Sequence, residues 1–239
     1  MMNADILAIG AHPDDVELSC SGTIAKEISA GKKVVIIDLT KGELGTRGSE
    51  KIRELESKKA GEILKISDRK NLGLKDGFFH NSDENKIKLV RLIRFYKPKI
   101  VLCNSINDRH PDHGRASKLV VESCFLSGLK KVTTKFQDIA QQPWKPLNIY
   151  HYVQWNLEIP DFIVDISDFL DIKLKSVQCY SSQFYDPESK EPKTPISSQN
   201  FLESIKYRSA NFGRIIGADY GEGFVANRKP AVASISDLI

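Results

Sequence analysis

Residues 6–18 of the chain read ILAIGAHPDDVEL. The apolar run Ile6–Ile9 predicts a buried strand, and a helical pattern follows it from Glu17 onward. His12 and the two carboxylates of Asp14 and Asp15 stand between these elements, where side chains at a strand end point into open space. The stretch therefore predicts a strand–helix unit whose connecting turn carries reactive groups.

A second cluster of the same kind lies about one hundred residues further on. It reads Arg109-His110-Pro111-Asp112-His113-Gly114 and follows another apolar run, Ile100–Cys103. Histidine and aspartate supply the nitrogen and oxygen ligands that a catalytic zinc accepts. The two clusters look like halves of one metal site, which points to metal-assisted hydrolysis.

The first half of the chain alternates between strand and helix patterns, which predicts a mostly parallel sheet with helices on both faces. We expect strands at Asp5–Gly10, Lys33–Leu39, Arg69–Leu72 and Ile100–Cys103, and helices at Glu17–Ala30, Ser49–Ile66, Glu84–Tyr96 and Arg115–Phe125. This is a Rossmann-like α/β fold, and we expect one domain over residues 1–239.

The pattern is looser beyond residue 126. We expect further strands at Leu147–Val153 and Phe162–Ile166, and helices at Asp168–Tyr180 and Ser197–Ile216. The segment Phe184–Pro195, rich in proline and charge, predicts a surface loop near the active site. We therefore divide the domain into a Rossmann-like core of about residues 1–130 and a C-terminal elaboration of about 131–239, which ends with the segment 220–225.

Topology brings the two clusters together. In a Rossmann-like sheet of strand order 3-2-1-4-5, strands 1 and 4 are neighbours, and ligands bind in the crevice at their carboxyl ends. If Asp5–Gly10 is strand 1 and Ile100–Cys103 is strand 4, both clusters flank that crevice.

The chemistry of the clusters suggests a role for each side chain. His12, Asp15 and His113 are the predicted metal ligands, since a catalytic zinc takes three protein ligands and keeps one position open. Asp14 is the predicted general base. His110 would face the developing oxyanion, and Asp112 would orient the His110 ring and favour its charged form.

Simpler explanations exist for single residues. A lone His or Asp after a strand is usually a helix cap or a solvated surface group. Asp15 and Asp112 could each be such a cap. A metal-dependent regulator without catalysis is a second possibility, and a protein that binds S-adenosylmethionine or NAD is a third. The third lacks the expected glycine fingerprint after the first strand.

The motifs AHPDDVE and HPDHGRA resemble those of the LmbE/PIG-L family of zinc-dependent N-acetylglucosaminide deacetylases. The resemblance covers essentially the whole chain and implies a Rossmann-like fold. It also implies that His12, Asp15 and His113 are the zinc ligands, Asp14 the base and His110 the polarising histidine. These are the roles that the residues themselves suggest.

Within the family, Thr40–Gly48 and Asp108-Arg109-His110 look most similar to the bacillithiol-biosynthesis deacetylases. This similarity implies N-acetylglucosaminyl L-malate as the substrate. The alternative is another N-acetylglucosamine-containing substrate: the free sugar, chitobiose or an antibiotic sugar. Mycothiol-pathway relatives carry a tyrosine where this chain has Asp108, so assistance from a tyrosine would have to come from elsewhere, with Tyr185 as the candidate.

Malate carries two carboxylates, which guanidinium groups bind well. Arg53, Arg109 and Arg47 are therefore the predicted contacts to the malate part. Glu43 and Asp76 follow the second and third predicted strands and could accept hydrogen bonds from sugar hydroxyls.

The composition limits the partners. The net charge is +4 over 239 residues without a basic block, so nucleic acid and membrane surfaces are not expected partners. The four cysteines form no CxxC pair, which is typical of a reducing cytoplasm. We expect a cytoplasmic homo-oligomer that binds an acetylated amino sugar and one Zn²⁺ per chain, although His and Asp ligands also accept Fe²⁺, Mn²⁺ or Co²⁺.

Overall fold

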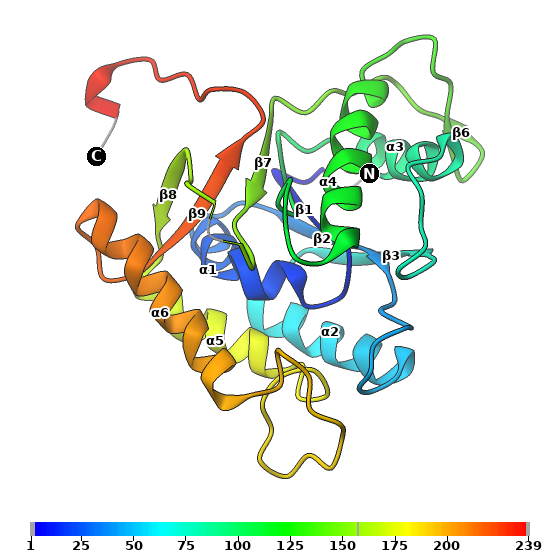
Figure 1. The fold of residues 1–239 in the computed structure, drawn as a ribbon. Coiled ribbons are helices and arrows are strands. Elements are labelled where there is room, and N and C mark those ends of the chain that lie inside the picture. Colours follow the sequence, from blue (N-terminus) through cyan, green and yellow to red (C-terminus); the bar gives the residue numbers. More distant parts are fainter. Residues whose placement is uncertain (1–2, 157, 238–239) are drawn as a thin grey trace.

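The computed structural model describes residues 3–156 and 158–237. Its centre is a seven-stranded sheet of order β3-β2-β1-β4-β7-β9-β8 (Figure 1). Within this sheet the strands are β1 (Ile6–Gly10), β2 (Val34–Thr40), β3 (Asp68–Leu74), β4 (Ile100–Cys103), β7 (Asn148–Tyr152), β8 (Phe162–Asp165) and β9 (Gly221–Ala226).

The first five strands of the sheet are parallel, as the alternating sequence pattern predicts. The predicted order of strands 1 to 4 is confirmed, and β7 takes the fifth place beside β4. β9 and β8 then extend the sheet in the antiparallel sense. β9 comes from the C-terminal segment 220–225, for which the sequence pattern indicates no element, and it lies between two strands that precede it in the chain.

Helices cover both faces of the sheet. They are α1 (Asp15–Ser29), α2 (Glu50–Leu64), α3 (Asp83–Tyr96), α4 (Pro111–Ser127), α5 (Leu170–Gln178) and α6 (Gln199–Ile216), with 3-10 turns at Ser167–Phe169 and Ile235–Asp237. A small hairpin joins β5 (Lys135–Phe136) to β6 (Ile139–Ala140). The predicted elements are confirmed to within a few residues, and Phe184–Pro195 forms no helix or strand.

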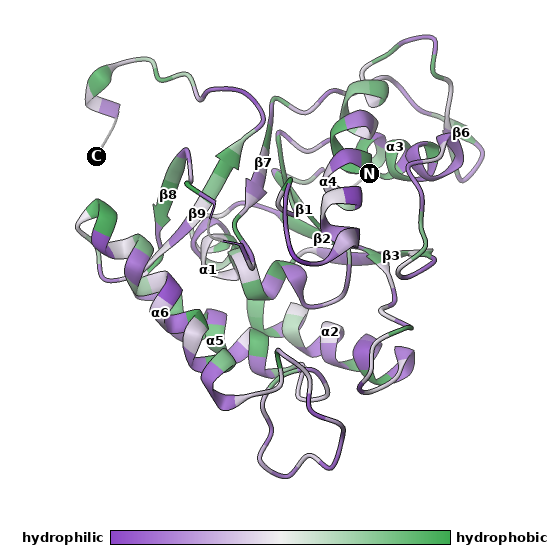
Figure 2. Cartoon of the chain, viewed as in Figure 1, coloured by the Kyte–Doolittle hydropathy of each residue, from purple (hydrophilic) through white to green (hydrophobic). Residues whose placement is uncertain are grey.

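Alternate side chains of β1 belong to two hydrophobic clusters, one on each face of the sheet. Leu7 and Ile9 are fully buried in the cluster that also contains residues of α3 and α4. Ile6 and Ala8 belong to the opposite cluster, with residues of α1. Figure 2 shows hydrophobic strands at the centre and helices striped with hydrophilic and hydrophobic residues. A strand covered on both faces reads as a continuous apolar run, which is why this one is recognisable in the sequence.

α1 is interrupted where it faces β9. Cys20 has non-helical angles (φ −139°, ψ 17°). The carboxylate of Glu222 in β9 accepts hydrogen bonds from the backbone N–H groups of Gly22 and Thr23, at 3.0 and 2.7 Å. It also pairs with Lys173 of α5, and each of these two side chains is only 2% exposed. Glu222 therefore caps the second part of α1 from a distant strand.

We predict that Glu222→Gln lowers the free energy of unfolding by about 3–5 kcal/mol, because Lys173 is then left buried without a charged partner. Urea unfolding measures the change. Lys229→Ala is the matched control, since it removes an ion pair whose lysine is 89% exposed, and it should change stability little. Equal effects of the two variants would contradict this account of the buried pair.

No helix among the described residues is long and apolar enough to cross a membrane. Cys20, Cys103 and Cys124 are buried, Cys179 is partly exposed, and all four are free thiols in the structure.

Candidate metal centre

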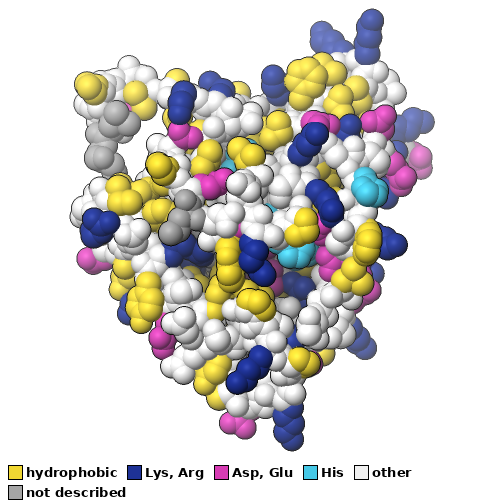
Figure 3. Space-filling model, in the orientation of Figure 1, with side chains coloured by type: hydrophobic (Ala, Val, Ile, Leu, Met, Phe, Trp, Pro, Cys, Tyr) yellow, Lys and Arg dark blue, Asp and Glu magenta, His cyan; other side chains and the backbone are white. Residues whose placement is uncertain are grey.

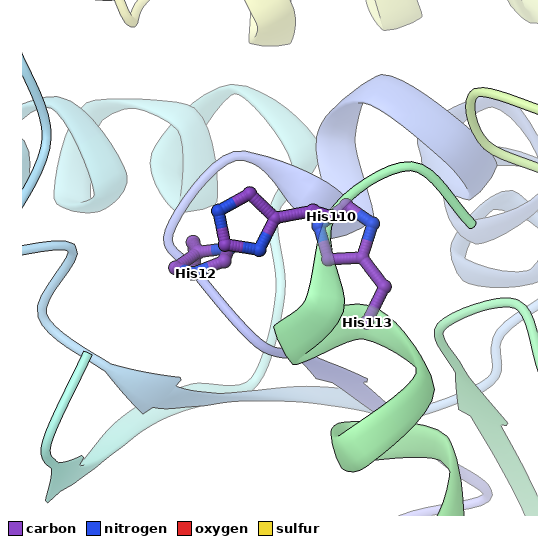
Figure 4. A group of neighbouring side chains, drawn as sticks. All are labelled: His12, His110 and His113. Atoms are coloured by element: carbon purple, nitrogen blue, oxygen red, sulfur yellow. The ribbon is translucent and has the colours of Figure 1, made fainter. Parts of the chain in front are cut away.

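Two chain segments meet at the carboxyl ends of β1 and β4. The turn between β1 and α1 carries His12, Asp14 and Asp15, while His110 and His113 lie at the beginning of α4. Figure 4 shows the three imidazole rings gathered at this point. The ring centre of His12 lies 4.6 Å from that of His110 and 5.6 Å from that of His113. The predicted crevice therefore brings both clusters together.

The carboxylate of Asp15 lies between two histidines. Its Oδ2 is 3.5 Å from Nδ1 of His12, and its Oδ1 is 3.2 Å from Nε2 of His113. Ligand atoms that surround a tetrahedral zinc are about 3.3 Å apart, given bonds of about 2.0–2.1 Å. Each histidine nitrogen therefore approaches the carboxylate of Asp15 at about the spacing of ligand atoms around a cation.

The other ring nitrogen of each histidine faces a carboxylate. Nε2 of His12 is 3.0 Å from Oδ1 of Asp76, and Nδ1 of His113 is 2.7 Å from Oδ2 of Asp108. Histidine ligands commonly donate their second N–H to a carboxylate, which orients the ring and raises its basicity. Burial lowers the pKa of His113, but Asp15 and Asp108 outweigh it and raise that pKa to about 9. A cation would compete with this proton.

Two other groups of donor atoms lie within 4.8 Å of one another: His12 with His110 and His113, and His12 with Asp76 and Asp112. The second group could also hold a cation. Its carboxylates, however, already accept protein N–H groups, from Leu44 to Asp76 and from Gly77 to Asp112. Asp15 also accepts protein N–H groups, so these bonds do not distinguish the two sets of ligands.

Asp15 is held by two residues that sequence reasoning missed. Asn104 Nδ2 donates to its Oδ2 at 3.0 Å, and Gln154 Nε2 donates to its Oδ1 at 2.6 Å. The backbone N–H of His12 also donates to Oδ2. Asp15 therefore does not cap α1, which was the alternative explanation. Asn104 and Gln154 closely follow the ends of β4 and β7. This position at the carboxyl edge of the sheet is the feature by which the sequence could have identified them.

Asp14 has an uncommon backbone conformation, with φ 120° and ψ −26°. Such angles are costly for a residue with a side chain, and they are found mainly at functional sites. Arg53 stabilises the turn, because its Nη2 donates to the backbone oxygen of Pro13 and, at 2.8 Å, to Oδ2 of Asp14. Burial raises the pKa of Asp14 to about 7, and the positive charge of Arg53 opposes this rise.

The structure corrects the role expected of Asp112. Its carboxylate lies 3.4 Å from Nε2 of His12 and pairs with Arg115, so it does not orient the ring of His110. Instead, Nδ1 of His110 caps α4 by accepting the backbone N–H of Asp112. Burial lowers the pKa of His110, helped by the positive charges of His12 and His113. Asp15 and Asp112 act to raise this pKa, so Asp112 does favour the charged ring as expected, but the net shift is downward.

A pocket of about 250 Å³ opens over the centre. Figure 3 shows histidine and acidic side chains in a hollow near the middle of this face, with hydrophobic and basic side chains around it. The predicted residues that line the pocket are His12, Asp14, Asp15, Arg53, Asp76, Arg109, His110 and His113.

Three residues expected near the substrate are not in the pocket wall. Oε1 of Glu43 accepts the backbone N–H of Asp76, while buried Arg47 donates to Ser189 in the loop after α5. Tyr185 is also absent from the wall, although its neighbour Phe184 belongs to it.

The aromatic part of the wall was not recognised from the sequence. Trp155 lies 5.6 Å from Phe201, and Phe201 lies 6.1 Å from Phe184, measured between stacked ring centres. Trp155 follows β7 closely and could have been placed at the carboxyl edge of the sheet. Phe201 lies on α6, and its place depends on how that helix packs.

The family model for GlcNAc-PI de-N-acetylase, PIG-L, matches residues 7–124. The chain is 30% identical over 230 residues to the diacetylchitobiose deacetylase of Thermococcus kodakarensis, covering 91% of this chain and 81% of the relative. It is 26% identical over 192 residues to a probable N-acetyl-alpha-D-glucosaminyl L-malate deacetylase 2 of Bacillus anthracis, covering 75% of this chain and 81% of the relative.

Solved structures agree with these matches. A conserved protein from Thermus thermophilus superposes with a TM-score of 0.86 at 33% identity, over 97% of this chain and 98% of the other. The N,N'-diacetylchitobiose deacetylase from Pyrococcus horikoshii superposes with a TM-score of 0.80 at 27% identity, over 99% of this chain and 89% of the other. The chain therefore belongs to the PIG-L family and is an N-deacetylase of substrates that contain N-acetylglucosamine.

Proposed function

We propose that His12, Asp15 and His113 hold one zinc ion, beside which the enzyme removes the acetyl group from an N-acetylglucosamine residue in a short neutral sugar such as diacetylchitobiose. The position of Asp15 carries the proposal. Its carboxylate stands between two histidines whose outer nitrogens are already paired with Asp76 and Asp108. Fe²⁺, Mn²⁺ or Co²⁺ would suit the same ligands.

A cation at this place supplies a Lewis acid that polarises the amide carbonyl and makes water more acidic. The protein supplies the remaining chemistry. The overall reaction adds water across the C–N bond of the amide, which yields acetate and a free amine.

Asp14 is the proposed proton carrier. Arg53 binds its Oδ2, and within the described residues Oδ1 makes no hydrogen bond, so that oxygen is available on the side of the pocket. Asp14 would take a proton from the attacking water and give it to the departing amine nitrogen. Burial helps because it raises the pKa of this carboxylate to about 7, close to the pH of the reaction.

His110 is the proposed donor to the acetamide oxygen. Since its Nδ1 accepts the N–H of Asp112, the ring proton of neutral His110 lies on Nε2. A neutral ring can donate this N–H to the oxygen as negative charge develops there. This role needs no charge on the ring and is consistent with the lowered pKa of His110.

The geometry favours a neutral sugar over N-acetylglucosaminyl malate. Of the three arginines expected to bind malate, Arg53 is occupied by Asp14 and Pro13, and Arg47 does not line the pocket. Of these three, only Arg109 is left for two carboxylates, and the guanidinium of Arg208, which also lines the pocket, already donates to backbone oxygens. The malate glycoside, and with it bacillithiol biosynthesis, remains the second candidate because of Arg109 and the relative from Bacillus anthracis.

The substrate is tested by acetate release from diacetylchitobiose, free N-acetylglucosamine and N-acetylglucosaminyl malate, each offered to the zinc-loaded protein. We expect the highest kcat/KM for diacetylchitobiose. A strong preference for the malate glycoside would replace this proposal by the second candidate. No acetate from any of the three, with zinc bound, would reject both.

Asp14→Ala should lower kcat by about 10²–10⁴-fold, the usual contribution of a general acid–base group. Zinc should stay bound, because Asp14 is not among the proposed ligands. Metal content and kcat are measured on the same sample, and Asp14→Asn serves as a variant of nearly unchanged shape. Full activity in either variant would rule out the proposed role.

Asp108→Asn should weaken zinc binding by about 10–100-fold, because the carboxylate partner of a histidine ligand supports its basicity. Competition with a coloured chelator measures the affinity. Asp83→Asn is the control, since Asp83 is 98% exposed at the start of α3. An unchanged affinity in Asp108→Asn would argue against His113 as a ligand.

Arg53→Met should move the acidic limb of the kcat/KM profile to higher pH. The positive charge of Arg53 lowers the pKa of Asp14, so its removal raises that pKa further. The base acts only when ionised, and activity is therefore lost at a higher pH as the solution is acidified. Arg53→Lys keeps the charge and should move the limb less. An acidic limb at the same pH in Arg53→Met would show that Asp14 does not set it.

We further propose a cytoplasmic enzyme that assembles as a homo-oligomer and has neither nucleic acid nor membrane as partner. The moderate net charge and the four free cysteines support the location and the absence of such partners.

A further inference from the structure

A cation–aromatic pair stands at the mouth of the pocket. Cζ of Arg109 lies 4.4 Å from the ring centre of Trp155, and both residues line the pocket. Arg109 is exposed and Trp155 is 38% exposed. The stacked ring restricts the guanidinium to a small region of the mouth without using any of its N–H groups.

The hydrogen-bond donors of this pair have no acceptor in the part of the chain that the structure describes. Within residues 3–156 and 158–237, neither the guanidinium of Arg109 nor the indole N–H of Trp155 has a hydrogen-bond acceptor. The other two arginines of the pocket differ. Arg53 donates to Asp14 and Pro13, and Arg208 donates to the backbone oxygen of Gln154. The pair thus offers donors to a ligand that brings its own acceptors.

The pair is tied firmly to the metal centre. Oδ1 of Asp108 accepts the backbone N–H groups of Arg109 and Asn156, while its Oδ2 is paired with His113. Gln154, directly before Trp155, donates to Asp15. One carboxylate and one amide therefore set the position of the mouth relative to the two proposed metal ligands. A ligand part bound at the mouth would also position the part that reacts.

The wall behind the pair is apolar. Trp155, Phe201 and Phe184 form a row of stacked rings. Phe201 and Phe184 belong to the same hydrophobic cluster as Ile196 and Leu18, and all five residues line the pocket. A sugar ring matches such a surface, because it presents C–H groups beside hydroxyl oxygens. A dianion would find Arg109 as the one pocket guanidinium without an acceptor among the described residues, beside an apolar wall, which is a poorer match.

We propose that Arg109 and Trp155 form a second subsite, which binds the sugar residue linked to the N-acetylglucosamine that is deacetylated. This inference rests on the proposed function and adds the part of the protein that selects a disaccharide over a monosaccharide. Arg109 donates to the oxygens of the second sugar, while Trp155 holds Arg109 in place and offers its indole N–H beside it.

The test compares kcat/KM for diacetylchitobiose with kcat/KM for free N-acetylglucosamine. In Arg109→Met and Trp155→Ala this ratio should fall about tenfold, the loss expected for a hydrogen bond to a charged donor. Trp155→Phe keeps an aromatic ring and should lose less. Thermal unfolding of each variant identifies any that fails to fold.

Phe125→Ala is the matched control. Phe125 is 57% exposed on α4 and also lies under a cation, with Nζ of Lys145 at 5.8 Å from its ring centre, but it does not line the pocket. This variant should leave the ratio unchanged.

Each result has a separate meaning. A lower ratio in Arg109→Met and Trp155→Ala, but not in Phe125→Ala, supports the subsite. An unchanged ratio, or an equal loss for both sugars, overturns the subsite and leaves the proposed function standing. A preference for N-acetylglucosaminyl malate that is lost in Arg109→Met also overturns it, in favour of an anionic group at the mouth. No turnover of either sugar by the zinc-loaded wild type overturns the proposed function and the subsite together.

Discussion

The hydrogen bonds to the carboxylate of Asp15 join three strand ends into one site. His12 comes from the end of β1, Asn104 from the end of β4 and Gln154 from the end of β7, and all three donate to this one group. His113 approaches it from α4. Burial acts to raise the pKa of Asp15, but the neighbouring side chains of His113 and His12 hold it well below its usual range. The carboxylate of Asp15 therefore stays negatively charged at the centre of the crevice, where a cation would bind.

A second buried network anchors the helix that carries this motif. Oε1 of Glu17 accepts from Nη1 of Arg69 and from the hydroxyl of Tyr180. Arg69 also binds both carboxylate oxygens of Asp38 in β2. The first turn of α1 is thus tied to β2, β3 and the end of α5. Such a buried network is costly unless its groups are paired, so it favours one arrangement of these elements over others. The uncommon backbone of Asp14, just before this turn, is held against the fixed helix.

Sequence reasoning succeeded where a local pattern has one structural meaning. The apolar run Ile6–Ile9 followed by His12 and Asp15 predicts a strand end with reactive side chains, and the order of parallel strands predicts that His113 meets them. Sequence reasoning failed where several partners lie within reach of one side chain. Asp112 is only two residues from His110 in the chain, yet its carboxylate faces His12 and Arg115 because the first turn of α4 directs it there.

The sequence by itself determined the α/β alternation, the strand order around the crevice and the chemistry of the two motifs, because periodicity and strand-end position are local properties. The tertiary structure decided which groups remain available to a substrate. In the structure Arg53 is paired with Asp14, Arg47 lies outside the pocket wall, and Arg109 lies beside Trp155 in that wall. It also inserts β9 between β7 and β8 and caps α1 with Glu222. These outcomes depend on contacts between residues far apart in the chain, and no local pattern records them.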